Sequence, residues 1–323
     1  MSPGQPANAA LHRIGEVGVW TRQFNFFPTS RVRRAVRDLE ALGYGAVWVG
    51  ETVYREPLTH AAVLLGATDR MVVATGIAAI WARDPFAATA AALTLAEAYP
   101  DRFVLGIGVS HASLVEDVRG TYYRRPLATM RDYLDGMDRA ATAYGAVAPP
   151  STPRLLAALG PRMLELAATR AQGALTYLVP PEHTRRAREI LGPDAALCVE
   201  QALLLDGTPS TARAVARKHL NRYLAMPNYV ANWRRLGFTD EDIAGVGSDR
   251  LVDALVSWGD PAAATTRVRE HLDAGADHVC IQLYHADLEH LPEDGWRQVA
   301  ETLGLIPGGA TTFRAESVPP RSD

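Results

Sequence analysis

The stretch TGIAAIWARDPFAATAAALTLAEAYPDRFVLGIGVSHAS, residues Thr75–Ser113, predicts the fold of this chain. The apolar run Met71–Ala78 reads as a strand, and an alanine-rich helix is predicted over Pro85–Ala98, because proline favours the first helical position. A second apolar strand is predicted over Phe103–Ile107. Short parallel strands joined through a helix imply a right-handed crossover, with ligands bound beyond the carboxyl ends of the strands.

The same alternation of strand and helix recurs along the chain. We expect eight strands, at Ile14–Trp20, Gly45–Val49, Met71–Ala78, Phe103–Ile107, Arg154–Leu159, Ala174–Leu178, Ala196–Leu205 and Asp277–Leu283. Helices are expected between them, among them Ser30–Leu42, one that starts at Pro57, Pro85–Ala98 and Pro126–Tyr144. About 250 residues are typical of a (β/α)8 TIM barrel, which is the fold that the pattern favours. A doubly wound open sheet is the alternative, since periodicity does not show closure.

One region departs from this alternation. Residues 206–276, before the last strand, read as a helical insertion with helices at Thr211–Leu224, Ser248–Ser257 and Pro261–Ala274. The segment Met226–Gly247 within it is predicted either as a lid over the barrel mouth or as an enlarged helical segment without a gating role. We expect one barrel domain over residues 1–306 and a flexible tail over residues 307–323, which are rich in proline, glycine and serine.

The composition is that of a globular protein, with 323 residues, 48% of them hydrophobic, and a net charge of −3. This balance does not suggest a surface for nucleic acid or for an anionic membrane. We expect no membrane span and no secretion signal, and the cytoplasm is the expected compartment. Cys198 and Cys280 lie mid-strand and far apart, which predicts small core residues in a reducing environment.

Catalytic motifs with a metal or a covalent nucleophile are missing from the sequence. The histidines are scattered without metal-ligand spacing, so no metal is expected, and GxSxG, GxxxxGK and GxGxxG do not occur. Lys218 is the only lysine, so arginines, amides or hydroxyls would have to bind any phosphate. Glycine, aromatic and polar residues at the strand ends suit a cofactor that brings its own reactivity.

Three segments resemble the bacterial luciferase-like superfamily. They are LEALGYGAVWVGE from Leu39, the stretch from Thr75 to His111, and LLAALGPRMLELAATRAQGALTYLVP from Leu155. Within the superfamily the chain is most similar to the F420-dependent oxidoreductases, from about Ile14 to Leu305. The resemblance implies coenzyme F420 across the carboxyl-terminal mouth of a barrel and hydride transfer to or from a small organic substrate. The alternatives are an FMN-dependent monooxygenase that uses oxygen, and a non-catalytic flavin-binding member.

The resemblance also implies where the cofactor lies. Gly76-Ile77 matches the family's non-prolyl cis peptide behind the middle ring, and Gly108 and Val109 would bring backbone close to the ring. The turn Gly160-Pro161-Arg162 would border the ribityl and phosphate groups, and Thr176 and Tyr177 match a phosphate-binding neighbourhood. Proline at the start of this helix leaves amides free to face an anion. Arg185 or Arg186 could replace a lysine that some relatives carry, although a solvated helix face is the simpler interpretation.

Two residues are candidates for acid–base chemistry. Glu51 follows the second strand, where the family usually has an acidic residue, but Thr52 stands where several members have histidine. His111 follows the fourth strand at the position of the family's acid–base residue, and imidazole exchanges protons near neutral pH. Each residue also has a purely structural interpretation: Glu51 as one partner of an ion pair at the barrel rim, and His111 as a loop histidine that hydrogen-bonds to backbone.

Three aromatic residues are predicted to wall a substrate pocket. Trp20 and Trp81 end the first and third strands and could equally be plain packing residues. Tyr284 follows the last strand, in which Val279, Ile281 and Leu283 should face the helices, so Gln282 and Tyr284 should face the barrel interior and its mouth.

Two helices carry no charged residue where an outer barrel helix normally faces water. Residues 58–68 and 85–96 are apolar or small nearly all round. Such a face usually marks a partner site, and symmetric pairing is the commonest way to cover it. We therefore expect a homodimer through helices 57–68 and 85–98; the alternative is that Met226–Gly247 folds back over them.

Overall fold

The computed structural model describes residues 9–147, 152–205, 207–287 and 290–306. The strands are β1 (Val17–Trp20), β2 (Ala46–Val49), β3 (Val72–Thr75), β4 (Ala78–Ala79), β5 (Phe103–Gly108), β6 (Arg154–Ala157), β7 (Gly173–Thr176), β8 (Ala196–Leu205), β9 (Val256–Gly259) and β10 (His278–Leu283). The first helices are α1 (Ala9–Arg13), α2 (Thr29–Ala41), α3 (Pro57–Leu65), α4 (Pro85–Ala98), α5 (Pro126–Ala143), α6 (Pro161–Arg170) and α7 (Pro181–Leu191). The later ones are α8 (Pro209–Leu224), α9 (Pro227–Arg235), α10 (Asp240–Ile243), α11 (Asp249–Leu255), α12 (Pro261–Asp273) and α13 (Glu293–Leu303). The predicted tail lies outside the described residues.

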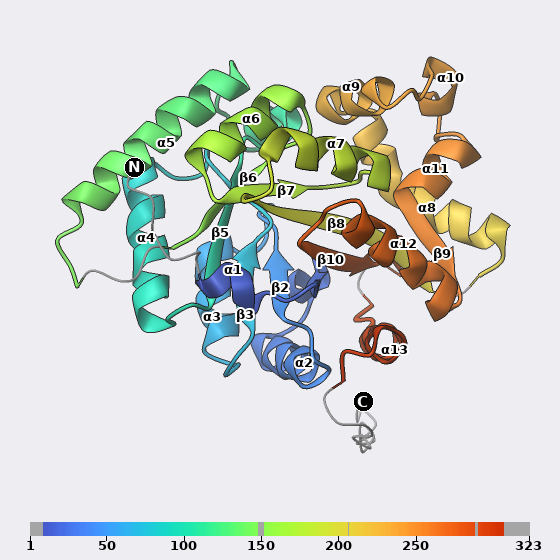
Figure 1. The fold of residues 1–323 in the computed structure, drawn as a ribbon, viewed down its shortest axis with the longest axis horizontal. Coiled ribbons are helices and arrows are strands. Elements are labelled where there is room, and N and C mark those ends of the chain that lie inside the picture. Colours follow the sequence, from blue (N-terminus) through green and yellow to red (C-terminus); the bar gives the residue numbers. More distant parts are fainter. Residues whose placement is uncertain (1–8, 148–151, 206, 288–289, 307–323) are drawn as a thin grey trace, which may run out of the picture.

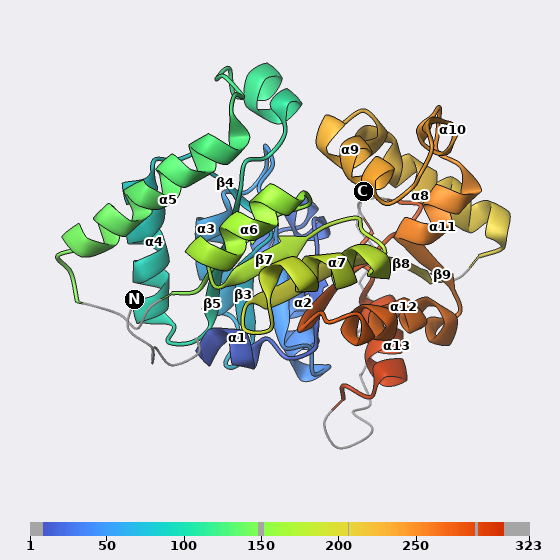
Figure 2. The same ribbon diagram turned by 45° about the horizontal axis from the view of Figure 1, so that its top comes forward.

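Eight parallel strands close into a barrel, with helices around it (Figures 1 and 2). β1 pairs with both β2 and β10, and β10 pairs with β8, so the ring β1-β2-β3-β5-β6-β7-β8-β10 has no open edge. The predicted (β/α)8 TIM barrel is therefore confirmed, and the doubly wound open sheet is wrong.

Strand alternation separates the two faces of the barrel wall as predicted. Cys198 and Cys280 pack with Trp48 in the barrel interior, and both cysteines are buried and free. Val279 and Ile281 belong instead to the larger core between the strands and the surrounding helices. The period-two pattern of the last strand thus places its alternate side chains correctly.

Two strands differ from the prediction. The predicted strand Met71–Ala78 is split into β3 and β4, because the chain turns at a cis peptide bond between Gly76 and Ile77. β9 falls partly within the predicted helix Ser248–Ser257, which is wrong at its end. β8 continues beyond Val199, its last residue that pairs with β7. β9 pairs with the edge of β8 that is left unpaired there.

The insertion packs as a group of its own beside the barrel mouth. Trp233 of α9, Leu220 of α8 and Leu251 of α11 are buried together in a separate apolar cluster. Both views show α9 and α10 on the opposite side of the molecule from α3 and α4 (Figures 1 and 2). The alternative that Met226–Gly247 covers those two helices is therefore wrong. None of the helices in the described ranges combines the length and apolarity that crossing a membrane requires.

The homodimer remains a proposal, and the apolar face that α4 offers for it is smaller than the sequence predicted. α5 lies along α4 (Figure 2), and its Met130 and Leu134 share the core with Ala88 and Ala92. Phe86, which is 50% exposed, remains on the uncovered side of α4.

If a second copy covers this side, Ala90→Arg should convert the dimer to monomer at micromolar concentration, because it places an unpaired charge within an apolar contact. Light scattering measures the mass. Ala214→Arg, on the exposed face of α8, is the matched control and should leave the mass unchanged. A wild-type monomer, or a dimer that survives Ala90→Arg, would refute the interface.

Candidate active site

A cavity of about 420 Å³ opens at the carboxyl-terminal mouth of the barrel. The predicted residues on its wall are Trp20, Glu51, Gly76, Ile77, Val109, His111, Gly160 and Tyr177. The other predicted site residues, Trp81, Gly108, Pro161, Arg162, Thr176 and Tyr284, do not line it. The cavity lies where parallel barrels bind their ligands, and side chains from α8 and α9 form its outer wall.

Trp20 and the Gly76–Ile77 peptide form the floor. The Trp20 Nε1 donates a hydrogen bond of 2.8 Å to the carbonyl of Gly76. A Cβ atom on Gly76 would stand 2.7 Å from that same nitrogen, so only glycine allows the tryptophan to pack here. The predicted cis peptide at Gly76–Ile77 is confirmed, whereas its contact with a cofactor stays a prediction.

Several predicted residues support the wall from behind. A Cβ on Gly108 would stand 2.9 Å from the side chain of Ile77, so this glycine gives room to Ile77 rather than to a ligand. The Trp81 Nε1 donates to the carbonyl of Val109 at 2.7 Å. Thr176 is fully buried, because alternation along the strand gives the cavity Leu175 and Tyr177 instead. Gly108, Trp81 and Thr176 thus have packing contacts in this structure, and their predicted roles at a ligand stay predictions.

His111 is the titratable residue best placed for proton transfer. It follows β5, with Ser110 in the left-handed region at φ 56°, and its ring lies 5.6 Å from that of Tyr229 on α9. Burial lowers its pKa, a hydrogen bond with Asn228 opposes the shift, and the charge of Arg222 adds to it. Its Nδ1 is buried and has no hydrogen-bond partner among the described residues. A neutral imidazole with an unpaired nitrogen can accept a proton from a donor that reaches it.

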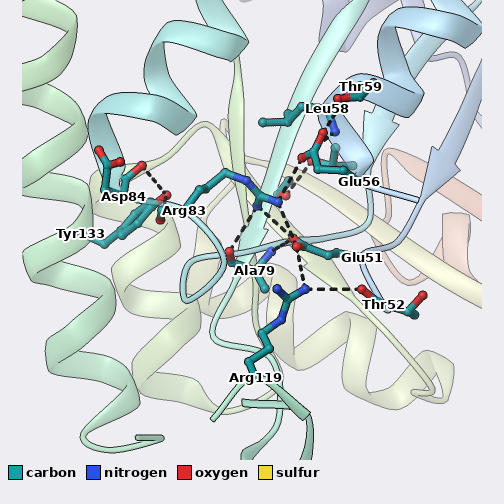
Figure 3. Close-up of polar contacts among 12 residues, drawn as sticks. Glu51, Thr52, Glu56, Leu58, Thr59, Ala79, Arg83, Asp84, Arg119 and Tyr133 are labelled. Atoms are coloured by element: carbon teal, nitrogen blue, oxygen red, sulfur yellow. Dashed lines mark hydrogen bonds and ion pairs between the residues drawn. The ribbon is translucent and has the colours of Figure 1, made fainter. Parts of the chain in front are cut away.

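Glu51 sits in a network of ion pairs (Figure 3). Its Oε1 accepts from Arg83 Nη2 and Arg119 Nη2, each at 2.9 Å. Its Oε2 accepts from Arg83 Nη1 at 2.9 Å and from the backbone amide of Ala79 at 2.7 Å. The side chain is only 4% exposed, and Arg83 also bonds to Glu56. A catalytic role for Glu51 stays a prediction, but this geometry occupies both carboxylate oxygens and joins the segments after β2, β4 and β5.

The uncapped N-terminus of α6 has the chemistry of an anion-binding corner, by which we mean Gly160, the first turn of α6 and Arg235. No side chain caps α6. The Arg235 Nη2 would lie 3.4 Å from a Cβ on Gly160, and no carboxylate pairs with this arginine among the described residues. The predicted Arg162 points to solvent instead. Neither Arg185 nor Arg186 lines the cavity, and Arg186 pairs with Glu182.

The sequence analysis missed the cavity arginines Arg22, Arg222 and Arg235. Arg222 and Arg235 belong to α8 and α9, and nothing in the sequence sets the position of the insertion over the barrel mouth. Within the described residues, no three histidine, cysteine, aspartate or glutamate side chains are grouped so that they could hold a metal ion.

Comparison with known proteins identifies the family. The model of the luciferase-like monooxygenase family matches residues 10–278, so the chain belongs to this family. A protein of Mycobacterium tuberculosis, provisionally named a coenzyme F420-dependent oxidoreductase, is 25% identical over 310 residues, which cover 76% of this chain and 87% of that protein.

Solved structures share the fold. An F420-dependent secondary alcohol dehydrogenase in complex with an F420–acetone adduct has a TM-score of 0.67 at 13% identity, covering 91% of this chain and 99% of that one. The oxygenating constituent of 3,6-diketocamphane monooxygenase from Pseudomonas putida, in complex with FMN, has a TM-score of 0.64 at 14% identity, covering 90% and 96%. The fold is thus shared with proteins that bind either cofactor.

Proposed function

We propose that the protein is an F420-dependent oxidoreductase that transfers a hydride between the deazaflavin and a small organic substrate. The observation that carries this proposal is His111, a histidine with a free nitrogen, on the wall of a cavity whose rim holds an anion-binding corner. The F420-dependent names of the Mycobacterium tuberculosis relative and of the dehydrogenase of similar fold support it.

The residues at the mouth fit such a cofactor. A helix N-terminus without a cap favours an anion, and Arg235 adds a charged donor beside it, so the corner suits the cofactor phosphate. Trp20, Gly76 and Ile77 offer an apolar floor on which a ring system could lie. When bound, the deazaflavin would supply the hydride chemistry.

The chain's own part is proton transfer and exclusion of water. As substrate carbon gives up a hydride, its hydroxyl proton passes to the neutral imidazole of His111, and the reverse reaction returns that proton. Tyr229 and Tyr223 are buried and Tyr177 is partly buried around the cavity, and they shield this proton transfer from solvent.

Cofactor titration tests the proposal directly. We expect F420 to bind at least tenfold more tightly than FMN, about 1.4 kcal/mol, because F420 carries acidic groups beyond its phosphate and Arg235 at the corner lacks a carboxylate partner among the described residues. Quenching of cofactor fluorescence measures both affinities. Equal or tighter binding of FMN would overturn the F420 proposal in favour of a flavin monooxygenase.

Variants of the corner locate the binding. Arg235→Gln should weaken the binding of either cofactor by about tenfold, because one charge-assisted hydrogen bond is lost. Arg234→Gln removes the same charge from the next residue, which pairs with Asp240 outside the cavity, and should not change either affinity. Unchanged affinity in Arg235→Gln would remove the corner from the phosphate site.

A further inference from the structure

Arg222 is an uncompensated cation in the cavity wall. It lies on the last turn of α8, and no carboxylate pairs with it among the described residues. Its Nη2 donates to the hydroxyl of Tyr223 at 2.6 Å, and its guanidinium carbon lies 4.6 Å from the centre of that ring. A guanidinium has five N–H donors, so this contact leaves most of them for a ligand.

A chain of hydrogen bonds fixes the position of this guanidinium. We call Tyr223, Tyr177 and Gln282 the tyrosine chain. The Tyr223 hydroxyl donates to that of Tyr177 at 3.3 Å, which donates to Oε1 of Gln282 at 2.7 Å. Because a carbonyl oxygen only accepts, every bond runs from Arg222 inward to β10. The arginine is thus held in place by neutral acceptors before any ligand arrives.

The buried carboxyl group of Glu200 does not neutralise it. Glu200 of β8 is 1% exposed, and one of its oxygens has no partner among the described residues. Burial raises the pKa of Glu200 to about 8, although a bond from the amide of Leu178 opposes the shift. Glu200 is therefore mostly protonated at neutral pH, and Arg222 keeps its full charge.

A second arginine lies on the same side of the mouth. Arg22 follows β1, lines the cavity and has no carboxylate partner in the described part of the chain. Arg22 and His219 line a second hollow that shares Arg22 with the cavity, and Arg222 follows His219 by one helical turn on α8, so both cations neighbour this histidine. The Tyr229 ring lies 5.6 Å from that of His111 and 4.9 Å from that of Tyr223, the tyrosine that Arg222 contacts. Arg222 and His111 therefore share one part of the cavity, whereas Arg235 lies at the corner at α6.

We propose that Arg222 and Arg22 bind the carboxylate of a small organic acid, so that the substrate of the reaction proposed above is an acid held with its reacting carbon beside His111. Planar guanidinium groups match a carboxylate with two parallel hydrogen bonds, which gives orientation as well as affinity. A neutral substrate would leave both cations without a partner inside the cavity.

Binding of matched acids and alcohols tests this proposal. The probes are lactate against propane-1,2-diol and benzoate against benzyl alcohol, titrated by calorimetry at constant ionic strength into the full chain, with and without saturating F420. We expect at least one acid to bind about tenfold or more tightly than its neutral partner. Arg222→Gln should abolish the preference, and Arg222→Lys, which keeps the charge, should retain part of it. The control Arg234→Gln should keep all of it.

The outcomes distinguish a failure of the proposed anion site from a failure of the proposed cofactor. Equal binding of acid and alcohol in both pairs, or a preference that survives Arg222→Gln, overturns the anion site. A loss of F420 affinity in Arg222→Gln with an unchanged acid preference overturns it too, because the arginine would then serve the cofactor. An acid preference that depends on Arg222 in a protein that does not bind F420 supports the site, while the proposed cofactor fails.

Discussion

Replacing His111 with alanine is expected to lower turnover by about 100-fold or more, because general acid–base catalysis contributes roughly 10²–10⁴-fold. The affinity for the cofactor should change by less than about threefold, since proton transfer acts in the transition state and not in cofactor binding. Steady-state kinetics and cofactor titration of the same variant separate the two effects. His12→Ala, exposed on α1, is the matched control and should keep wild-type turnover. Turnover of His111→Ala within about threefold of wild type, roughly 0.6 kcal/mol of barrier, would exclude His111 from the proton transfer.

The pH profile gives an independent readout of His111. Burial lowers its pKa from 6.5, so the neutral imidazole prevails at pH 7. Oxidation of the substrate needs this neutral base, so its rate should be constant near neutral pH and fall as pH drops through the lowered pKa. The reverse direction needs the protonated form, and its rate should rise over the same interval. His111→Ala should lose the inflection in both directions.

The barrel and the floor of its cavity could be predicted from the sequence because both follow from local patterns. Proline at the first helical position marks helix starts such as Pro85 and Pro161, and a polar or glycine residue after each strand falls at the mouth. His111 and Gly160 follow predicted strands in this way, whereas Gly76–Ile77 was predicted from the family resemblance. Closure could not be predicted, because it depends on pairing between β1 and β10, more than 250 residues apart in sequence.

The outer wall of the site could not be predicted, for a physical reason. Arg222 and Arg235 reach the cavity only because α8 and α9 pack over the mouth, and local patterns specify a helix without specifying where it docks. Thr176 and Tyr177 were predicted together for a phosphate-binding neighbourhood; alternation along the strand turns Tyr177 toward the cavity and Thr176 away from it, and the phosphate contact stays a prediction. Val256 was predicted at the end of a helix but lies in β9, because pairing with the edge of β8 outweighs the helical pattern of this segment.

The second large effect is expected for stability at the Glu51–Arg83 pair. Arg83→Ala should lower the free energy of unfolding by about 3 kcal/mol, because removal of one partner leaves a buried charge only partly compensated. Arg119 would remain on Glu51, but its side chain is 30% exposed, against 11% for Arg83. Arg83 also anchors Glu56 and the carbonyl of Ala79, and both contacts are lost with it. Guanidinium denaturation monitored by circular dichroism gives the stability.

Two comparisons make this expectation specific. Arg234→Ala removes an arginine from an ion pair whose side chains are 56% and 78% exposed, and should change stability by less than about 1 kcal/mol. Removal of both charges in Glu51→Leu/Arg83→Met should recover part of the loss, because no buried carboxylate is then left uncompensated, while the contacts of Arg83 with Glu56 and Ala79 stay lost. Glu51→Gln distinguishes a structural role of Glu51 from a catalytic one. If the carboxylate is only structural, the variant should be less stable and should keep the pH inflection of His111. If it is catalytic, the variant should lose turnover at wild-type stability. Wild-type stability in Arg83→Ala would show that the pair does not hold the segments after β2 and β4 together.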